Sequence, residues 1–417
     1  MSFKPDGFGC EGVTDYFKAV EGPDGSWAGW DSLFGCVGLY SGMRTVLKPV
    51  EEQVIVITGA TSGIGLATAK AAAARGAKLV LAARNEGVLE QTVREIVGDG
   101  GKAIHVVTDV SKREEIERLA EAATMQFGGF DTWVNNAGLG LWGRLEEVSD
   151  ADHRQLFDIN FWGVVYGSTT AVRHLKQRGG ALINLGSVAS DFAFPLQGMY
   201  STTKHAVKGF TDALRRELKD EKAPISVTLI QPAATGTPFA LHAKNYTEQE
   251  AKLPPPVYAP ESVAEAILFA AEHPRRALHV GGAGKVMGII SRLTPKLVDV
   301  TSSLMIKSQV KDEPKKPRPD SLWKAGEDGS VRGDQKWIRP SLYTAGYVHP
   351  AVTATAFGLI GVAAGIWGWK RARGLLSVGV GDLGRQAIAS CCPILFGMGR
   401  VVWDGMWVFS RCCGGRR

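Results

Sequence analysis

The sequence has no cysteine between Cys36 and Cys391, although the whole chain of 417 residues contains six. A disulfide framework in this long central part is therefore excluded, and the pattern is typical of proteins in a reducing compartment. Near the end, cysteines stand as the pairs Cys391-Cys392 and Cys412-Cys413. Their spacing matches no familiar zinc pattern, so we interpret them as free thiols, with acylation near a membrane or metal binding as alternatives.

Residues 1–369 also lack a net charge. The formal charge of +6 belongs to the tail that begins at Lys370, where basic residues outnumber acidic ones. No basic groove for nucleic acid is therefore predicted in the main part of the chain. The eight histidines include no pair at metal-ligand spacing, so we predict no metal site. We also expect no signal peptide, because acidic residues interrupt the start and no apolar core follows.

From Gln53 onward, apolar runs alternate with helical patterns. Strands alternating with helices of about 10–15 residues indicate a parallel sheet covered by helices on both faces. The predicted fold is thus α/β, a Rossmann-type doubly wound parallel sheet of about seven strands. The expected strands are 54–57, 78–83, 103–108, 132–134, 181–185, 225–230 and 278–280, and the expected helices are 63–75, 86–97, 112–126, 152–177, 200–219 and 260–272.

The composition divides the chain into five parts. We expect an N-terminal extension over residues 1–50, a catalytic domain over 51–308, a polar linker over 309–349, a hydrophobic helix over 350–369 and a basic tail over 370–417. The linker is rich in Lys, Pro, Asp and Gly, which is typical of a solvated segment. Residues 237–260 are expected to form a mobile cover over the substrate.

Residues 350–369 carry no charge and end with two tryptophans, directly before Lys370 and Arg371. A bilayer core requires about 20 apolar residues, and aromatic and basic residues are favoured at its edge. We therefore predict a transmembrane helix here, with a buried helix or an oligomer contact as the alternative. The second apolar stretch, over residues 387–409, either returns the chain through the membrane or, because it contains Arg400 and Asp404, lies on the surface of anionic lipid.

A glycine-rich turn follows the first predicted strand and precedes a helix. In this context Gly59 allows a tight turn, Gly63 lets the backbone approach a pyrophosphate, and Gly65 permits close packing of helix on strand. The positive end of the following helix favours phosphate groups. We therefore predict a dinucleotide site rather than a purely structural turn. Its predicted residues in this turn are Gly59, Thr61, Ser62, Gly63, Ile64 and Gly65.

The second predicted strand ends without an acidic residue. An acid there would accept a hydrogen bond from the 2′-hydroxyl of NAD, whereas this chain has Ala83 followed by Arg84. The planar guanidinium of Arg84 suits a 2′-phosphate. The sequence therefore favours NADP over NAD, and the alternative is that Arg84 is a solvated residue of the next turn.

Ser187, Tyr200 and Lys204 form a possible proton-transfer group. Tyr200 and Lys204 are four residues apart at the start of a predicted helix, so the phenol and the ammonium share one face. Ser187 follows the apolar run over residues 181–185. Alone, this pattern also fits a core serine, a half-buried tyrosine and a solvated lysine. The glycine-rich turn upstream favours the functional interpretation.

The region from Gln53 to Val286 resembles the short-chain dehydrogenase/reductase family. The resemblance rests on T-G-x-x-x-G-x-G at 58–65, N-N-A-G at 135–138, F-D-I-N ending at Asn160, and a serine thirteen residues before Y-x-x-x-K. It implies that the catalytic residues are Asn160, Ser187, Tyr200 and Lys204. It also implies cofactor contacts from Asp109 and Val110 at the adenine, from Asn136, Ala137 and Gly138 beside the cofactor, from Pro232, Thr235 and Thr237 near the nicotinamide, and from Tyr200 and Lys204.

In this family scheme Tyr200 gives a proton to the substrate oxygen as general acid. An unperturbed phenol has a pKa near 10, and we expect Lys204 and the oxidised nicotinamide to lower the pKa of Tyr200. Lys204 would also hold the nicotinamide ribose. Ser187 would hydrogen-bond the substrate oxygen, and Asn160 would position a water that returns protons to Lys204.

The predicted function is interconversion of a carbonyl and a secondary alcohol with NADP(H), on a lipophilic substrate. The alternative is a non-catalytic NADP-binding sensor or scaffold protein at a membrane. We expect the catalytic domain to face the cytoplasm and the C-terminal segment to associate with a membrane. No nucleic-acid partner is expected, and the family resemblance implies a homodimer or homotetramer.

Overall fold

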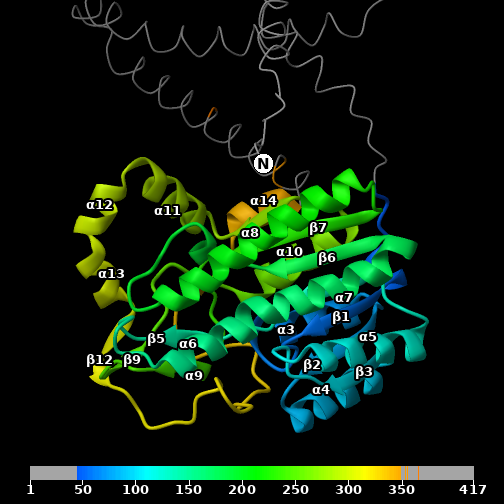
Figure 1. The fold of residues 1–417 in the computed structure, drawn as a ribbon, viewed down its shortest axis with the longest axis horizontal. Helices are drawn as coiled ribbons and strands as arrows, with labels where there is room; N and C mark the ends of the chain where they lie inside the picture. Colours follow the sequence, from blue (N-terminus) through cyan, green and yellow to red (C-terminus); the bar gives the residue numbers. More distant parts are fainter. Residues whose placement is uncertain (1–44, 349–352, 354, 356–364, 366–417) are drawn as a thin grey trace, which may run out of the picture. The chain divides into compact units, whose positions relative to one another are not determined.

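Seven parallel strands form the central sheet, in the order β11-β7-β6-β4-β1-β2-β3 (Figure 1). The structure is a computed structural model that describes residues 45–348 together with Thr353, Thr355 and Gly365. It confirms the predicted α/β class and the parallel sheet. The strands are β1 (Val54–Thr58), β2 (Lys78–Ala83), β3 (Lys102–Val107), β4 (Thr132–Asn135), β6 (Gly180–Leu185), β7 (Ile225–Pro232) and β11 (Ala277–Val280).

Side chains of β1 alternate between two apolar cores, one on each face of the sheet. Ile55 and Ile57 belong to the core that also contains residues of α3, α4 and α10. Val54 and Val56 belong to the core with residues of α5, α7 and α8, the face that Figure 1 views. The period of two along a strand explains this division. The helices are α3 (Gly63–Ala74), α4 (Glu86–Gly98), α5 (Arg113–Phe127), α7 (Gly163–Arg178), α8 (Gly198–Asp220) and α10 (Pro260–Glu272).

The strand order reverses at β1. From β1 the sheet continues to β2 and β3 on one side and to β4, β6, β7 and β11 on the other. Ile57 pairs with Leu81 of β2 and with Val134 of β4, so the three strands end at the same edge. Open α/β sheets bind ligands outside the carboxyl ends of the strands, where the order reverses. A ligand site is therefore expected at the loops after β1, β2 and β4.

The single helix expected over residues 152–177 is divided in the structure. α6 (Asp150–Phe157) and α7 are joined by a π-helical turn, Asp158–Trp162. A π turn adds one residue to the turn and shifts the side chains that follow, and such turns are frequent at functional sites. Asn160 lies in the middle of this turn.

Residues that follow α13 pack on the domain, so the expected solvated linker over residues 309–349 is wrong as far as Val348. β12 pairs with β9, and β13 pairs with β10. Leu322 is only 1% exposed. Composition misled us because this segment is held mainly by backbone hydrogen bonds, which any residue can make. The elements are β9 (Gln249–Ala251), β10 (Val257–Tyr258), α13 (Ser302–Ser308), β12 (Val310–Pro314), β13 (Ile338–Arg339) and α14 (Leu342–Val348).

The expected cover over residues 237–260 contains short helical and strand segments. Figure 1 shows α11, α12 and α13 following one another in an arc, which we call the arm. Met287, Val298 and Met305 of the arm pack against the cluster of Ala189, Phe192 and Phe194. The remaining elements are η1 (Val50–Glu52), β5 (Leu141–Trp142), η3 (Val188–Ser190), α9 (Phe239–His242), β8 (Lys244–Asn245), α11 (Gly282–Leu293) and α12 (Pro295–Val300).

The chain divides into two units after Val348. The expected hydrophobic helix over residues 350–369 lies outside the described residues apart from three positions, and the tail over 370–417 lies wholly outside them. The N-terminal extension is described only from residue 45. Among the described residues, none of the helices combines the length and the apolar character needed to cross a bilayer.

Candidate active site

The glycine-rich loop after β1 forms a tight cradle. Gly59 has φ +66° and Gly63 has φ +52°, which are left-handed values that favour glycine. A Cβ added to Gly65 would lie 2.0 Å from the carbonyl oxygen of Gly59, so the helix start touches the loop backbone. Asn136 supports the loop, because its Nδ2 donates to the carbonyl oxygens of Thr58 (2.9 Å) and Gly59 (3.1 Å).

α3 begins directly behind this loop. Ser62 occupies the N-cap position and its side chain makes no capping hydrogen bond. The first turn of a helix carries N–H groups and a partial positive charge, which together bind anions. The close approach at Gly65 and this helix start fit the pyrophosphate of a dinucleotide, so the residues present are those that such a cofactor requires.

A cavity of about 250 Å³ lies at this edge of the sheet. It brings together nearly all residues that the sequence singled out for the cofactor and for catalysis. Two of them do not line it: Gly65, which packs behind the loop, and Asn160. The predicted residues that do line it are Gly59, Thr61, Ser62, Gly63, Ile64, Arg84, Asp109, Val110, Asn136, Ala137, Gly138, Ser187, Tyr200, Lys204, Pro232, Thr235 and Thr237.

Asn160 is fully buried and its side chain holds the loop after β4. Its Oδ1 accepts from Leu139 N at 2.8 Å, and its Nδ2 donates to Leu139 O at 2.9 Å and to Thr203 Oγ1 at 3.2 Å. The amide is thus committed to protein partners. Asn160 Oδ1 lies beside Gly138, where a Cβ added to the glycine would be 3.3 Å from it.

Ser187, Tyr200 and Lys204 meet at the inner end of the cavity. Ser187 caps η3 directly after β6, and its Oγ accepts from Ala189 N at 3.1 Å. Tyr200 and Lys204 lie in the first turns of α8, with Lys204 Nζ 5.9 Å from the centre of the Tyr200 ring. Lys204 Nζ also donates to Leu185 O at 2.8 Å, which fixes the ammonium under the end of β6.

The electrostatics of this group differ from the expected lowering of the tyrosine pKa. Burial raises the pKa of Tyr200 to about 12, while a hydrogen bond with Ser187 acts in the opposite direction. Burial also lowers the pKa of Lys204 to about 8. Desolvation disfavours the charged form of both groups, so it outweighs the attraction that the spacing of the two residues suggested.

Arg84, directly after β2, also lines the cavity. Its guanidinium donates to the carbonyl oxygens of Ser321 and Leu322. In the described part of the chain its partners are thus neutral carbonyls rather than carboxylates. A guanidinium has five N–H donors, so two such bonds leave capacity for an anion.

Two further parts of the cavity wall were not singled out residue by residue from the sequence. One is apolar: Phe239 lies edge-on to the Tyr200 ring, with 5.3 Å between the ring centres, and Val188, Phe194 and Leu253 line the same space. Phe239 and Leu253 belong to residues 237–260, which were predicted as a cover over the substrate. The other comes from the segment taken for a linker, and consists of Ser321, Ala325, Gly326 and Asp328. No motif marks these residues, because they reach the cavity only through the three-dimensional path of the chain.

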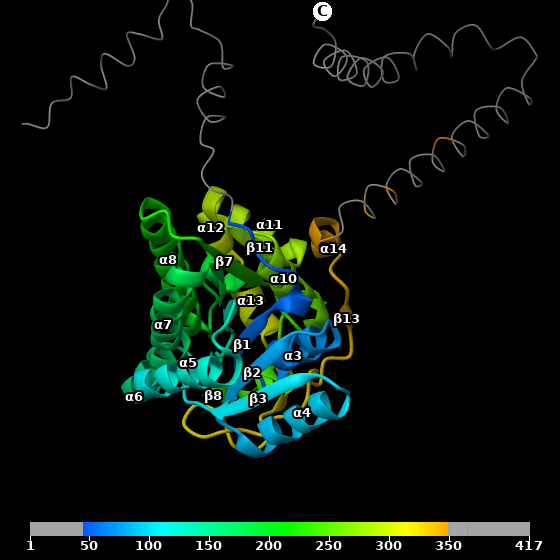
Figure 2. The same cartoon turned by 90° about the vertical axis from the view of Figure 1, so that its right-hand side faces the viewer.

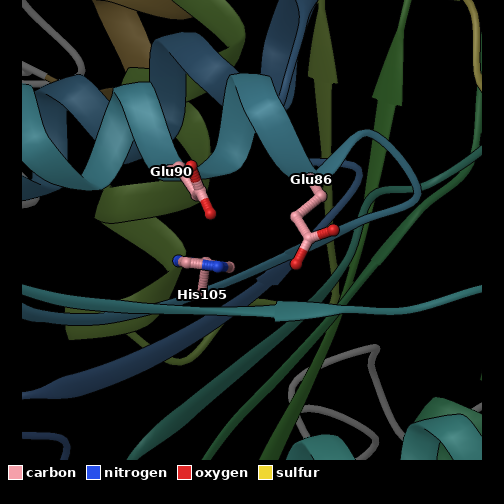
Figure 3. A group of neighbouring side chains, drawn as sticks. All are labelled: Glu86, Glu90 and His105. Atoms are coloured by element: carbon pink, nitrogen blue, oxygen red, sulfur yellow. The ribbon is translucent and has the colours of Figure 1, made fainter.

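One group of possible metal ligands occurs among the described residues, on the outer surface of α4 and β3 (Figure 3). Glu86, Glu90 and His105 place one ligand atom each within 4.8 Å of one another. The side chains of both glutamates are exposed. None of the three lines the cavity. Exposed acidic groups repel one another weakly in water and need no ion, so we assign no metal site here.

The parallel sheet, its reversed strand order at β1 and the glycine-rich loop at that edge define an α/β protein of the Rossmann type. The sequence profile of the short chain dehydrogenase family matches residues 53–248. The chain therefore belongs to the short-chain dehydrogenase/reductase family, whose members among its relatives are oxidoreductases.

Alignments with known proteins extend beyond residues 53–248. The chain is 45% identical over 334 residues to the uncharacterized oxidoreductase YxnA of Bacillus subtilis, an alignment that covers 78% of this chain and 92% of that protein. It is 35% identical over 222 residues to mouse dehydrogenase/reductase SDR family member 7B, covering 51% and 68%. A short chain dehydrogenase/reductase from Burkholderia phymatum, solved in complex with NAD, superposes with a TM-score of 0.52 at 28% identity, covering 64% of this chain and 98% of that one.

Proposed function

We propose that this protein is an NADP(H)-dependent oxidoreductase that reduces a lipophilic carbonyl compound to a secondary alcohol, with Tyr200 as the general acid. The observation that carries the proposal is that Ser187, Tyr200 and Lys204 line the same cavity as the phosphate cradle. A bound dinucleotide would supply the hydride, and the protein would bind the substrate and provide the proton.

The protonation state of Tyr200 suits the role of general acid in the reduction. With a pKa raised to about 12 by burial, the phenol keeps its proton at neutral pH. The protonated phenol is the form that can donate to a carbonyl oxygen as negative charge develops there. Ser187 can donate a second hydrogen bond to that oxygen. Below about pH 8 the ammonium of Lys204 stabilises the phenolate that remains.

The wall around Tyr200 supports a lipophilic substrate. Val188, Phe194, Phe239 and Leu253 present apolar surface to the cavity. The binding free energy of a ligand becomes more favourable with each methylene group that it buries against such a wall. We therefore expect the full chain to consume NADPH with carbonyl compounds in solution, and to do so faster as the apolar part of the compound grows. Turnover is scored against the Tyr200→Phe variant. NADPH binding without turnover on any carbonyl compound would favour a sensor or scaffold instead.

Arg84 is proposed to determine the cofactor preference. The Arg84→Ala variant should raise the Kd of NADPH by about 10–100-fold, because a charge-assisted contact to a phosphate is worth one to two factors of ten. The Kd of NADH should change little. Both constants are measured from the fluorescence of the bound nicotinamide.

Arg84→Lys is the matched control for this change. It keeps the charge and loses the planar fork, so its loss for NADPH should be intermediate. Equal losses for NADPH and NADH in Arg84→Ala would show that Arg84 acts only through Ser321 and Leu322, and would refute the NADP preference. The NAD bound by the Burkholderia phymatum relative makes this comparison necessary.

We also propose that the protein associates with a membrane, with its catalytic domain facing the cytoplasm. Support comes from the arm formed by α11, α12 and α13, which exposes apolar side chains beside four basic residues and one acid. Such a surface suits anionic lipid. The uncharged residues 350–369 follow α14 in the sequence and are proposed as the membrane segment. The exposed apolar residues of the arm are Val286, Ile289, Ile290, Leu293, Leu297, Val300 and Leu304.

A chain that ends at Val348 separates these two contributions. The full chain should remain in the membrane pellet after alkaline carbonate extraction. The shortened chain should bind anionic membranes at low salt and be released by high salt, because screening removes its electrostatic contact. Release of the full chain by carbonate would refute the membrane segment, and failure of the shortened chain to bind at low salt would refute the role of the arm.

A further inference from the structure

Residues 320–334, which we call the strap, contribute part of the wall of the cavity. Ser321, Ala325, Gly326 and Asp328 line the same cavity as the glycine-rich loop. The strap lies outside residues 53–248, which carry the family profile. Figure 2 shows the yellow-to-orange chain pass below β8 and then rise past β13 to α14.

The strap is bonded directly to the phosphate cradle. Thr61 Oγ1 donates to Asp328 Oδ2 at 2.7 Å, Gly329 N donates to Thr61 O at 2.8 Å, and Gly63 N donates to Ser330 O at 2.9 Å. These bonds join the strap to the loop from which a pyrophosphate would be held. The cavity remains between them, so the strap forms a wall and does not fill the space.

The other end of the strap is bonded to Arg84 and its neighbour. Arg84 donates to the carbonyl oxygens of Ser321 and Leu322, and Asn85 Nδ2 donates to Gly326 O at 3.1 Å. The arginine that the proposed function assigns to the 2′-phosphate is therefore positioned by the strap.

Ser321 has an unsatisfied hydroxyl at this point. The residue lines the cavity and is only 4% exposed, and its Oγ has no hydrogen-bond partner in the part of the chain that the structure describes. A buried hydroxyl without a partner is unfavourable and is rare in native proteins. A phosphate oxygen beside Arg84 is a strong acceptor that would satisfy it. Because the Oγ itself is closed to solvent, this contact requires the side chain to rotate about its Cα–Cβ bond.

The strap is also fixed on its outer side, away from the cavity. Trp323 Nε1 donates to Asp152 Oδ1 at 2.7 Å, and His242 Nε2 bonds to Glu327 O at 2.7 Å. Leu322 is buried between these points. Several bonds must therefore break together before the strap can leave the cavity.

We propose that the strap is a second wall of the dinucleotide site, in which the Ser321 hydroxyl binds the 2′-phosphate beside Arg84 and the cofactor leaves only when the strap detaches. This inference rests on the proposed function, because it requires a dinucleotide in the cavity. It assigns cofactor binding to a segment whose sequence carries no nucleotide-binding motif.

The first experiment measures the equilibrium binding of NADPH and NADH to the full chain. Ser321→Ala should raise the Kd of NADPH by about tenfold, the value of one hydrogen bond to a charged group, and should leave the Kd of NADH unchanged. Ser303→Ala is the matched control, since Ser303 is exposed on α13 and lies outside both the strap and the cavity. No loss in Ser321→Ala, or equal losses for both cofactors, would overturn the assignment of Ser321.

The second experiment measures the rate at which NADPH is released, by stopped-flow displacement with excess NADP⁺. Trp323→Phe keeps an aromatic side chain but removes the N–H that donates to Asp152, so both association and dissociation of NADPH should become several-fold faster. Trp337→Phe is the control, because Trp337 is 81% exposed and lies outside the strap. An unchanged dissociation rate in Trp323→Phe would overturn the enclosure. Failure of the unaltered chain to bind NADPH at all would instead refute the proposed function.

Discussion

Replacing Tyr200 with phenylalanine is expected to lower turnover by about a thousandfold while leaving the Kd of NADPH within a factor of about two, because a positioned general acid contributes between about a hundredfold and ten-thousandfold. The substitution removes one oxygen. The ring keeps its edge-on contact with Phe239 at 5.3 Å, so the shape of the cavity is preserved. Steady-state consumption of NADPH measures the loss, and nicotinamide fluorescence measures binding.

Tyr246→Phe provides the matched control. The Tyr246 hydroxyl also makes protein hydrogen bonds, to Ser149 and Asp152, but the residue does not line the cavity. Its loss should leave turnover nearly unchanged. Residual activity of Tyr200→Phe above a few per cent, with Tyr246→Phe fully active, would remove Tyr200 from its role as general acid.

The sheet was predictable because its signal is local. Each central strand is a short apolar run, and both faces of β1 are buried, so no polar alternation confuses the pattern. The glycine-rich loop was predictable for a similar reason. Gly59, Gly63 and Gly65 are close in sequence, and their backbone requirements are fixed by that spacing.

The strap was not predictable from composition. Its contacts to Thr61, Gly63 and Arg84 join residues more than two hundred positions apart, and most of its acceptors are backbone carbonyls that no side chain announces. A segment rich in charge and proline is typical of a linker when it has no partner surface. Here the edge of the sheet supplies that surface, and Leu322 and Trp323 fix the segment to it.

The direction of the Tyr200 pKa shift could not be predicted from the sequence either. The spacing of Tyr200 and Lys204 indicated attraction between their charges, but it contained no information on desolvation. In the structure both groups are surrounded by protein, and burial disfavours the charged form of each. Asn160 illustrates the same limit, since only the π turn reveals that its amide is committed to Leu139 and Thr203.

Among substitutions that add one methyl group, Gly65→Ala should raise the Kd of NADPH the most. The added Cβ would lie 2.0 Å from Gly59 O and 2.6 Å from Asn136 Nδ2, well inside contact distance. Relieving this overlap must move the helix start or the loop. Overpacking of this kind costs about 1–3 kcal/mol, so the Kd of NADPH should rise by about 10–100-fold if the loop moves. The midpoint of thermal unfolding should fall by several degrees.

Gly209→Ala is the control that separates this overlap from the ordinary effect of alanine in a helix. Gly209 lies inside α8, and an added Cβ there meets nothing within 4 Å. Alanine should therefore stabilise the protein by about 0.5–1 kcal/mol, since it restricts the unfolded chain and favours the helix. NADPH binding should not change. If Gly65→Ala binds NADPH as tightly as Gly209→Ala does, the close contact between α3 and the loop is not what shapes the phosphate cradle, and the dinucleotide assignment loses its geometric basis.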